Sequence, residues 1–109
     1  MSISLQKPLA DFFSATNARD ADALFALFAP EATVDDEGFQ YHGLDSIRGW
    51  IAETVERFRF NIDVVDASLA AEQASIMGVV SGDFSGSPAR VRYDFKLDQQ
   101  KIVSLKVGA

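Results

Sequence analysis

The first half of the chain opens with two stretches whose apolar residues recur at helical spacing. The first stretch predicts an amphipathic helix that starts between Ser4 and Pro8 and ends near Ala18. A second, short helix is expected after Asp20, which is a good N-cap, and it cannot continue past Pro30. The stripe that this second helix buries is expected to consist of Leu24, Leu27 and Phe28.

A third helix is expected from Asp45 to Phe58, where the helical period is the clearest in the chain. Such a long apolar stripe must be covered by another part of the protein. The expected buried face consists of Ile47, Trp50, Ile51, Thr54, Val55 and Phe58.

Between the second and third helices the pattern predicts a short hairpin. Ala32 to Asp36 reads as a strand, Glu37-Gly38 as a turn, and Phe39 to His42 as the return strand. Alternation places Asp36 on the same face as two apolar residues of its strand, whereas Asp35 lies on the opposite face. We therefore expect Asp36 to face inward and Asp35 and Glu37 to be solvated.

After Arg59 the pattern alternates with a period of two, which is typical of strands. Gly78 and Gly82 suggest a bend or bulge within one of these strands. The last but one strand alternates best, with one buried and one wet face. The expected strands start at Phe60 and then cover Gln73 to Phe84, Ala89 to Leu97 (Val91, Tyr93, Phe95 and Leu97 inward; Arg90, Arg92, Asp94 and Lys96 outward) and Ile102 to Val107.

This order of elements predicts an α+β fold. The four later strands can pair as a meander, and the three helices are expected to pack on the concave face of a strongly curved antiparallel sheet. Helices over a concave sheet leave a conical cavity, so the fold class is a cone-shaped α+β barrel. A chain of 109 residues fits one domain, residues 1–109, with one core.

Composition and charge narrow the possible partners. Ten basic and sixteen acidic residues give a formal charge of −6, which makes nucleic acid and anionic membrane surfaces poor partners. The chain has no cysteine, so disulfides, thiolate zinc sites and thiol nucleophiles are excluded. The N-terminal sequence lacks the features of a signal peptide, and we expect a cytoplasmic protein.

The run NARDADALFALFAPEATVDD and the later YHGLDSIRGWI carry a family resemblance. Together with the order of elements, they resemble the SnoaL-like (polyketide cyclase-like) branch of the nuclear transport factor 2-like superfamily, which also includes ketosteroid isomerase. The resemblance covers essentially the whole chain. It implies the fold, whereas its members include isomerases, cyclases, hydrolases, dehydratases and binding domains, so function must be argued from the site.

The resemblance to ketosteroid isomerase implies roles for particular residues. Without gaps from Asn17 to Asp36, Asp36 falls on the isomerase's general base. The isomerase's tyrosine that donates to the oxyanion falls on Phe12, so that donor is missing here. Its second donor, a protonated aspartate, falls on Tyr93 if the strands are matched through Phe95. A carboxylate base and one buried donor could move a proton beside a carbonyl group.

Further candidate residues surround this pair. A carboxylate among aromatic side chains would be desolvated, which suits it to proton transfer. His42, the only histidine, could donate a proton, and Tyr41 beside it could orient a ligand, although only one of the two should face inward. A metal site is not expected, because no second histidine is present. The predicted ligand-binding residues are Phe12, Phe28, Tyr41, Trp50, Phe58 and Phe95.

Two hypotheses remain from the sequence. In the first, a cofactor-free acid–base isomerase or cyclase acts on a small hydrophobic molecule, with Asp36 as the base and Tyr93, Tyr41 or His42 as donors. In the second, the protein is a non-catalytic ligand-binding or dimerisation module whose pocket is filled by its own Phe and Trp side chains. No nucleotide-binding loop occurs in the sequence, and the resemblance implies a homodimer that packs through the outer sheet face.

Overall fold

The structure is a computed structural model that describes residues 5–56 and 60–108. It confirms the α+β class, with three helices and one six-stranded sheet. The elements are α1 (Lys7–Ala18), α2 (Ala21–Phe25), β1 (Phe28–Asp36), β2 (Phe39–His42), α3 (Gly43–Ile51) with a π-helical extension (Ala52–Glu56), β3 (Phe60–Leu69), β4 (Gln73–Gly82), β5 (Ala89–Asp98) and β6 (Lys101–Gly108).

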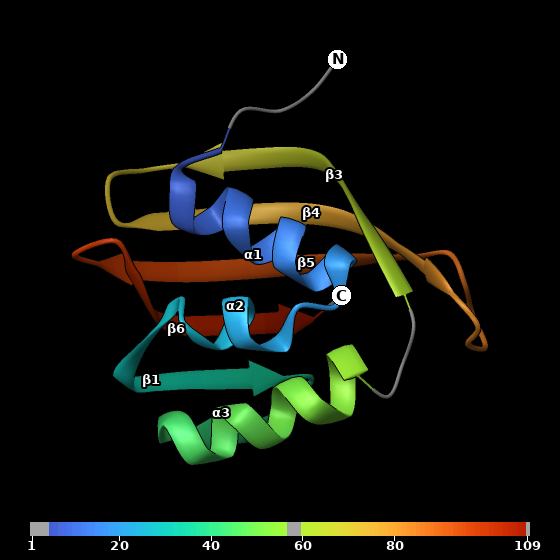
Figure 1. The fold of residues 1–109 in the computed structure, drawn as a ribbon. Helices are drawn as coiled ribbons and strands as arrows, with labels where there is room; N and C mark the ends of the chain where they lie inside the picture. The colour runs from blue at the N-terminus through green and yellow to red at the C-terminus, as the bar shows by residue number, and fades with distance from the viewer. Residues whose placement is uncertain (1–4, 57–59, 109) are drawn as a thin grey trace.

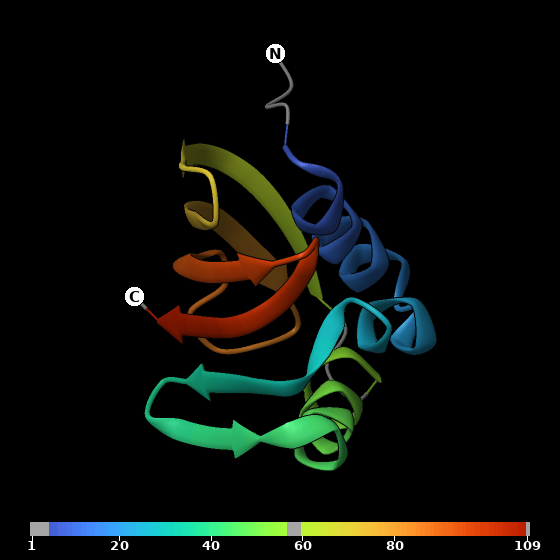
Figure 2. The same cartoon turned by 90° about the vertical axis from the view of Figure 1, so that its left-hand side faces the viewer.

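The strands lie in the order β2-β1-β6-β5-β4-β3. The last four form the expected antiparallel meander, and β1 pairs antiparallel with β2. β1 pairs parallel with β6, however, so the sheet is mixed and not purely antiparallel as the sequence predicted. All three helices cover one face of the curved sheet, as Figure 1 shows from the front and Figure 2 from the side.

The second helix is shorter than predicted. The Asp20 side chain caps it by accepting a hydrogen bond from the Ala23 amide at 3.1 Å, but the helix ends at Phe25. Phe28 is buried as expected, yet it begins β1 and pairs with Ile102. Pro30 lies inside β1 where the register with β6 shifts, a place that tolerates a residue without an N–H. Pairing with the last strand therefore ends the helix before Pro30 does.

The third helix presents the predicted face to the core. Ile47, Trp50, Ile51 and Val55 are buried, and Thr54 is half-buried. α3 begins at Gly43, two residues earlier than predicted, and its last turn is π-helical. Phe58 lies outside the described residues.

Side-chain contacts fix the helices against the curved sheet. Asn17 at the end of α1 donates to the Ile62 carbonyl at 2.9 Å and accepts from the Ile62 amide at 2.7 Å, which ties α1 to β3. The predicted irregularity near Gly78 is a register shift between Val64 and Asp66 on the facing strand, β3. It accompanies the strong curvature of the sheet in Figure 2.

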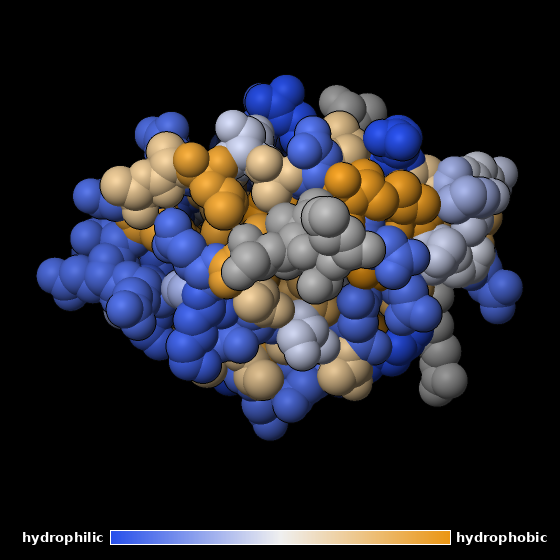
Figure 3. Space-filling view, turned by 90° about the horizontal axis from the view of Figure 1, so that it is seen from above, coloured by the Kyte–Doolittle hydropathy of each residue, from blue (hydrophilic) through white to orange (hydrophobic). Residues whose placement is uncertain are grey.

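The molecule's surface is mostly polar. Figure 3, which looks down from above the view of Figure 1, shows largely hydrophilic residues with separate apolar patches. β3 carries two of the exposed large apolar side chains, Val65 and Leu69. Within residues 5–56 and 60–108, no helix is long and apolar enough to cross a membrane.

Candidate functional site

A cavity of about 250 Å³ lies between the helices and the concave face of the sheet. Its walls come from α1, the end of β1, α3 with its π-helical extension, and strands β3 to β6. Most lining residues are apolar, and five are aromatic. These five are Phe12, Trp50, Phe60, Phe84 and Tyr93.

Asp36 lines this cavity at the end of β1. It lies on the same side of the strand as the fully buried Ala32 and Val34 and is itself half-buried. The indole N–H of Trp50 donates to the Asp36 carboxylate at 2.9 Å. Among the described residues, Trp50 is the one hydrogen-bond partner of this carboxylate. The second carboxylate oxygen is therefore available to a ligand.

Tyr93 lines the same cavity from β5 and is only 6% exposed. Its ring packs edge-on against Phe12 and Phe13, with centroids 6.0 and 5.3 Å away, and stacks on Phe95. Burial, and to a lesser degree the negative charge of Asp36, raise the pKa of Tyr93 far above its ordinary value. The hydroxyl therefore stays protonated across the physiological range and can donate a hydrogen bond.

The structure separates Tyr41 from His42. Tyr41 pairs with Val34 and is half-buried against the core, but it does not line the cavity. His42 is exposed and lines a polar hollow on the opposite, outer face of the sheet, together with Asp35. Strand alternation turns His42 away from the cavity, so in this structure it does not lie beside Asp36 as the expected proton donor would.

Four other predicted ligand-binding residues lie in the described part of the chain, which leaves out Phe58, and they divide into two groups. Phe12 and Trp50 line the cavity. Phe28 and Phe95 are buried in the core and do not line it: Phe28 packs edge-on against Trp50, and Phe95 packs against Phe12. These two side chains shape the cavity through the residues that they support.

Sequence reasoning missed several lining residues. Phe60 was predicted only as a strand residue, and Phe84 only as the end of a strand, whereas Phe84 lies in the β4–β5 connection at the cavity. Glu37, expected in solvent, is exposed but also lines the cavity. The alternation of Phe60 with Ile62 on the inner face of β3 was the signal that could have placed Phe60 there.

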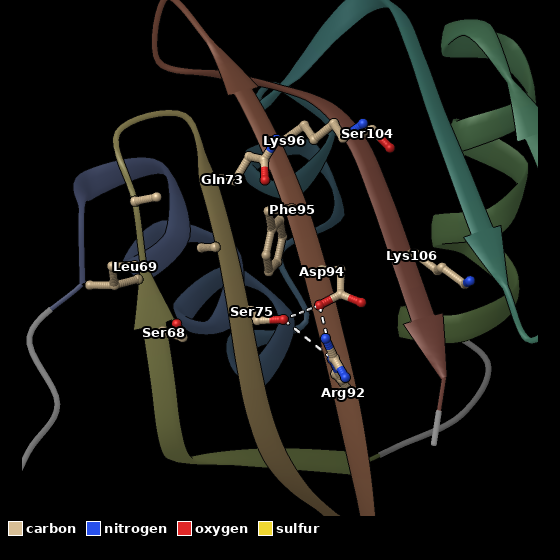
Figure 4. Close-up of a pocket in the computed structure, with 12 residues that line it drawn as sticks. Ser68, Leu69, Gln73, Ser75, Arg92, Asp94, Phe95, Lys96, Ser104 and Lys106 are labelled. Atoms are coloured by element: carbon tan, nitrogen blue, oxygen red, sulfur yellow. Dashed lines mark hydrogen bonds and ion pairs between the residues drawn. The ribbon is translucent and has the colours of Figure 1, made fainter.

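The outer face of the sheet carries the polar residues of β5, as predicted. A second hollow lies on this face, and Figure 4 shows three of its lining residues, Ser75, Arg92 and Asp94, joined by hydrogen bonds. Arg92 and Asp94 also form an ion pair at 3.1 Å. Among the described residues no group of three or more acidic or histidine side chains could hold a metal ion.

Comparison with solved structures identifies the same fold in other proteins. A candidate polyketide cyclase from Sinorhizobium meliloti is 29% identical, with 94% of each chain covered and a TM-score of 0.89. A protein with a ketosteroid isomerase-like fold from Catenulispora acidiphila, solved with trimethylamine, is 21% identical over 97% of this chain and 87% of its own, with a TM-score of 0.83. A nuclear transport factor 2-like protein of unknown function from Cytophaga hutchinsonii is 15% identical over 98% and 92%, with a TM-score of 0.78.

Comparison with known families and proteins completes this assignment. No curated protein matches the chain. Residues 9–104 match the SnoaL-like domain, which is most of the sequence. With the helices, the mixed sheet and the cavity described above, this match shows that the chain belongs to the SnoaL-like family and has the nuclear transport factor 2-like fold.

Proposed function

We propose that the cavity binds a small, mostly apolar organic molecule and that Asp36 transfers a proton on it without a cofactor. The observation that carries this proposal is a carboxylate fixed by an indole N–H at the wall of an apolar cavity, with the buried Tyr93 hydroxyl lining the same cavity. The similarity to a candidate polyketide cyclase supports a cyclase- or isomerase-type reaction.

The cavity's volume limits the ligand's size. An apolar cavity of about 150 Å³ accommodates benzene, so the 250 Å³ cavity suits a molecule of roughly ten non-hydrogen atoms. This is smaller than a four-ring steroid. We therefore expect a substrate with one or two small rings, or an open chain of similar size.

The proposed step begins at a carbon next to a carbonyl group. The Asp36 carboxylate takes a proton from that carbon, and the C–H electron pair forms the carbon–carbon double bond of an enolate. The carbonyl electrons move to oxygen, where the Tyr93 hydroxyl donates a hydrogen bond. Return of the proton from Asp36 to another carbon completes an isomerisation, whereas replacement of that proton by one from water before its return to the same carbon completes a hydrogen exchange.

Proton exchange tests this step without knowledge of the natural substrate. The probe is 2-indanone, an enolisable ketone of suitable size, whose deuterium uptake in heavy water is followed by NMR. We expect the protein to accelerate deuterium uptake. Asp36→Asn should reduce this acceleration by a factor of at least about 100. The matched control is Asp35→Asn, because Asp35 faces the outer hollow and its amide counterpart can still accept from Gly38.

The non-catalytic alternative predicts a different result. One form of this alternative has the pocket filled by the protein's own Phe and Trp side chains, and it does not fit the open cavity. In the other form, a binding protein could hold a ligand there without moving a proton. Binding of 2-indanone with no accelerated exchange, or equal exchange in the Asp36→Asn variant, would favour binding over acid–base work.

We also propose that the outer sheet face joins two copies of a cytoplasmic homodimer. Charges alternate across paired strands on this face, since Asp35 pairs with Lys106 and Lys106 pairs with Asp94. A surface of alternating charge can match a second copy related by two-fold symmetry. Lys106→Glu should therefore shift the protein toward a monomer in light scattering. A parent protein that already has the mass of a monomer would exclude the dimer.

A further inference from the structure

The residues described for the cavity lining carry a net negative charge. Asp36 and Glu37 are consecutive in the sequence, and both line it. Its described lining residues include no lysine, arginine or histidine. Because the low-dielectric walls of a cleft focus the field of its charged groups, this arrangement favours a cationic guest over a neutral or anionic one.

The exposure of the lining residues orders the cavity from floor to mouth. Phe12 and Tyr93 are 2% and 6% exposed, so they form the floor. Phe84 is 37% exposed and Glu37 is also exposed, so both lie at the mouth, while Phe60 is half-buried. The exposed part of the lining thus includes a carboxylate, Glu37, and an aromatic ring, Phe84, and the half-buried Phe60 ring lines the same cavity. Aromatic faces attract ammonium groups, and proteins recognise quaternary ammonium ligands with such rings.

A second observation points to a ligand in the same space. No hydrogen bond joins the Tyr93 hydroxyl to another described residue, although its side chain is more than nine-tenths buried and lines the cavity. Because no fully buried side-chain polar atom of the described residues lacks a partner, this hydroxyl must open onto the cavity, where a ligand or water can accept its hydrogen bond. The charge of Asp36 contributes to the raised pKa of Tyr93, so the field of the carboxylate reaches the cavity floor.

We propose that the ligand of this cavity carries a cationic nitrogen, as a protonated amine or quaternary ammonium group, held at the mouth by Glu37 with the rings of Phe60 and Phe84. The apolar body of the ligand fills the interior beside Tyr93 and Asp36. This inference rests on the ligand site of the proposed function but not on catalysis.

Two probes of equal shape and different charge test the inference. Phenyltrimethylammonium and tert-butylbenzene differ only in a cationic nitrogen or a carbon atom, and their roughly ten non-hydrogen atoms match the cavity. Trp50 is the only tryptophan and lines the cavity, so its fluorescence reports the binding of either probe. We expect the cation to bind with a Kd at least about tenfold lower at low salt, and this preference to shrink as salt is added.

The Glu37→Gln variant tests how much the carboxylate at the mouth contributes to binding of the cation. We expect it to reduce the affinity for the cation at least about fivefold while leaving tert-butylbenzene within about twofold. The matched control is Glu72→Gln, since Glu72 is an exposed residue of the β3–β4 turn that does not line the cavity. It should change neither affinity.

The outcomes distinguish this inference from the proposed function. Tighter or equal binding of tert-butylbenzene, or an unchanged preference for the cation in Glu37→Gln, would overturn the cationic ligand and leave the apolar ligand site intact. If neither probe binds to the parent protein, both the cationic ligand and the ligand site are overturned together.

Discussion

Gly78 lies within β4, where the structure leaves no room for a methyl group. A Cβ atom there would lie 2.7 Å from Cγ2 of Ile62 and 3.4 Å from Cε2 of Tyr93. Ile62 cannot retreat freely, because Asn17 holds both its amide and its carbonyl group. Tyr93 is held by the aromatic cluster around it. We therefore predict that Gly78→Ala destabilises the protein.

The magnitude follows from two opposing effects. Overpacking a core by a methyl group costs about 1–3 kcal/mol, whereas alanine restricts the unfolded chain and returns about 0.4–1 kcal/mol. The free energy of unfolding should therefore fall by about 1–2 kcal/mol, because the steric cost exceeds the gain. For a domain of this size, the fall corresponds to a loss of roughly 4–10 °C in Tm.

Gly49 supplies the matched control. It lies in α3, and a Cβ atom there would meet nothing within 4 Å. Gly49→Ala should therefore raise the free energy of unfolding by about 0.5–1 kcal/mol, since alanine favours a helix. Both variants are measured by urea unfolding at one protein concentration, with Trp50 fluorescence as the signal. A Gly78→Ala protein as stable as its parent, or destabilisation of similar size at both positions, would refute the reasoning.

Three further predictions concern other contacts. Burial and a nearby carboxylate raise the pKa of Tyr93 above 10.0, so its contribution to stability is complete below about pH 10 and is lost as the pH rises further, because the unfolded chain releases the proton first. Unfolding at several pH values should show this loss weakened in Tyr93→Phe but not in Tyr41→Phe; equal profiles would contradict it. Asn17→Leu leaves both backbone groups of Ile62 unpaired and should cost about 2–4 kcal/mol in urea unfolding, whereas a change below the error of the method would exclude the clamp. Asp20→Ala removes a helix cap and should cost about 1 kcal/mol in thermal unfolding; an unchanged Tm would show that the cap contributes nothing.

Local pattern was sufficient for most elements of this fold. The spacing of apolar residues gave α1, the buried face of α3 and the order of the four later strands, because each depends on residues close in sequence. It did not give the parallel pairing of β1 with β6, which joins distant segments. That pairing also explains why Phe28 lies in a strand and not in α2, because Phe28 pairs with Ile102 of β6. Ile102 is far along the chain, so the local pattern could not show this.

The candidate site was predictable only where a strand fixes the side of the sheet. Alternation along β1 is enough to separate Asp36 from Asp35, and the structure has Asp36 at the cavity and Asp35 on the outer face. Alternation along β2 sends His42 outward, but the sequence could not say which way that short strand faces. Phe84 was beyond prediction, because a loop without a regular period sets its direction.

The central claim is that Asp36, held by Trp50, faces a ligand cavity. The chain has one tryptophan, so the indole N–H gives one NMR resonance that reports the hydrogen bond to Asp36. We predict that this resonance moves in Asp36→Asn and when 2-indanone is added to the parent protein, and that it keeps its position in Asp35→Asn. An indole N–H resonance that keeps its position both in Asp36→Asn and when the ligand is added would contradict the account.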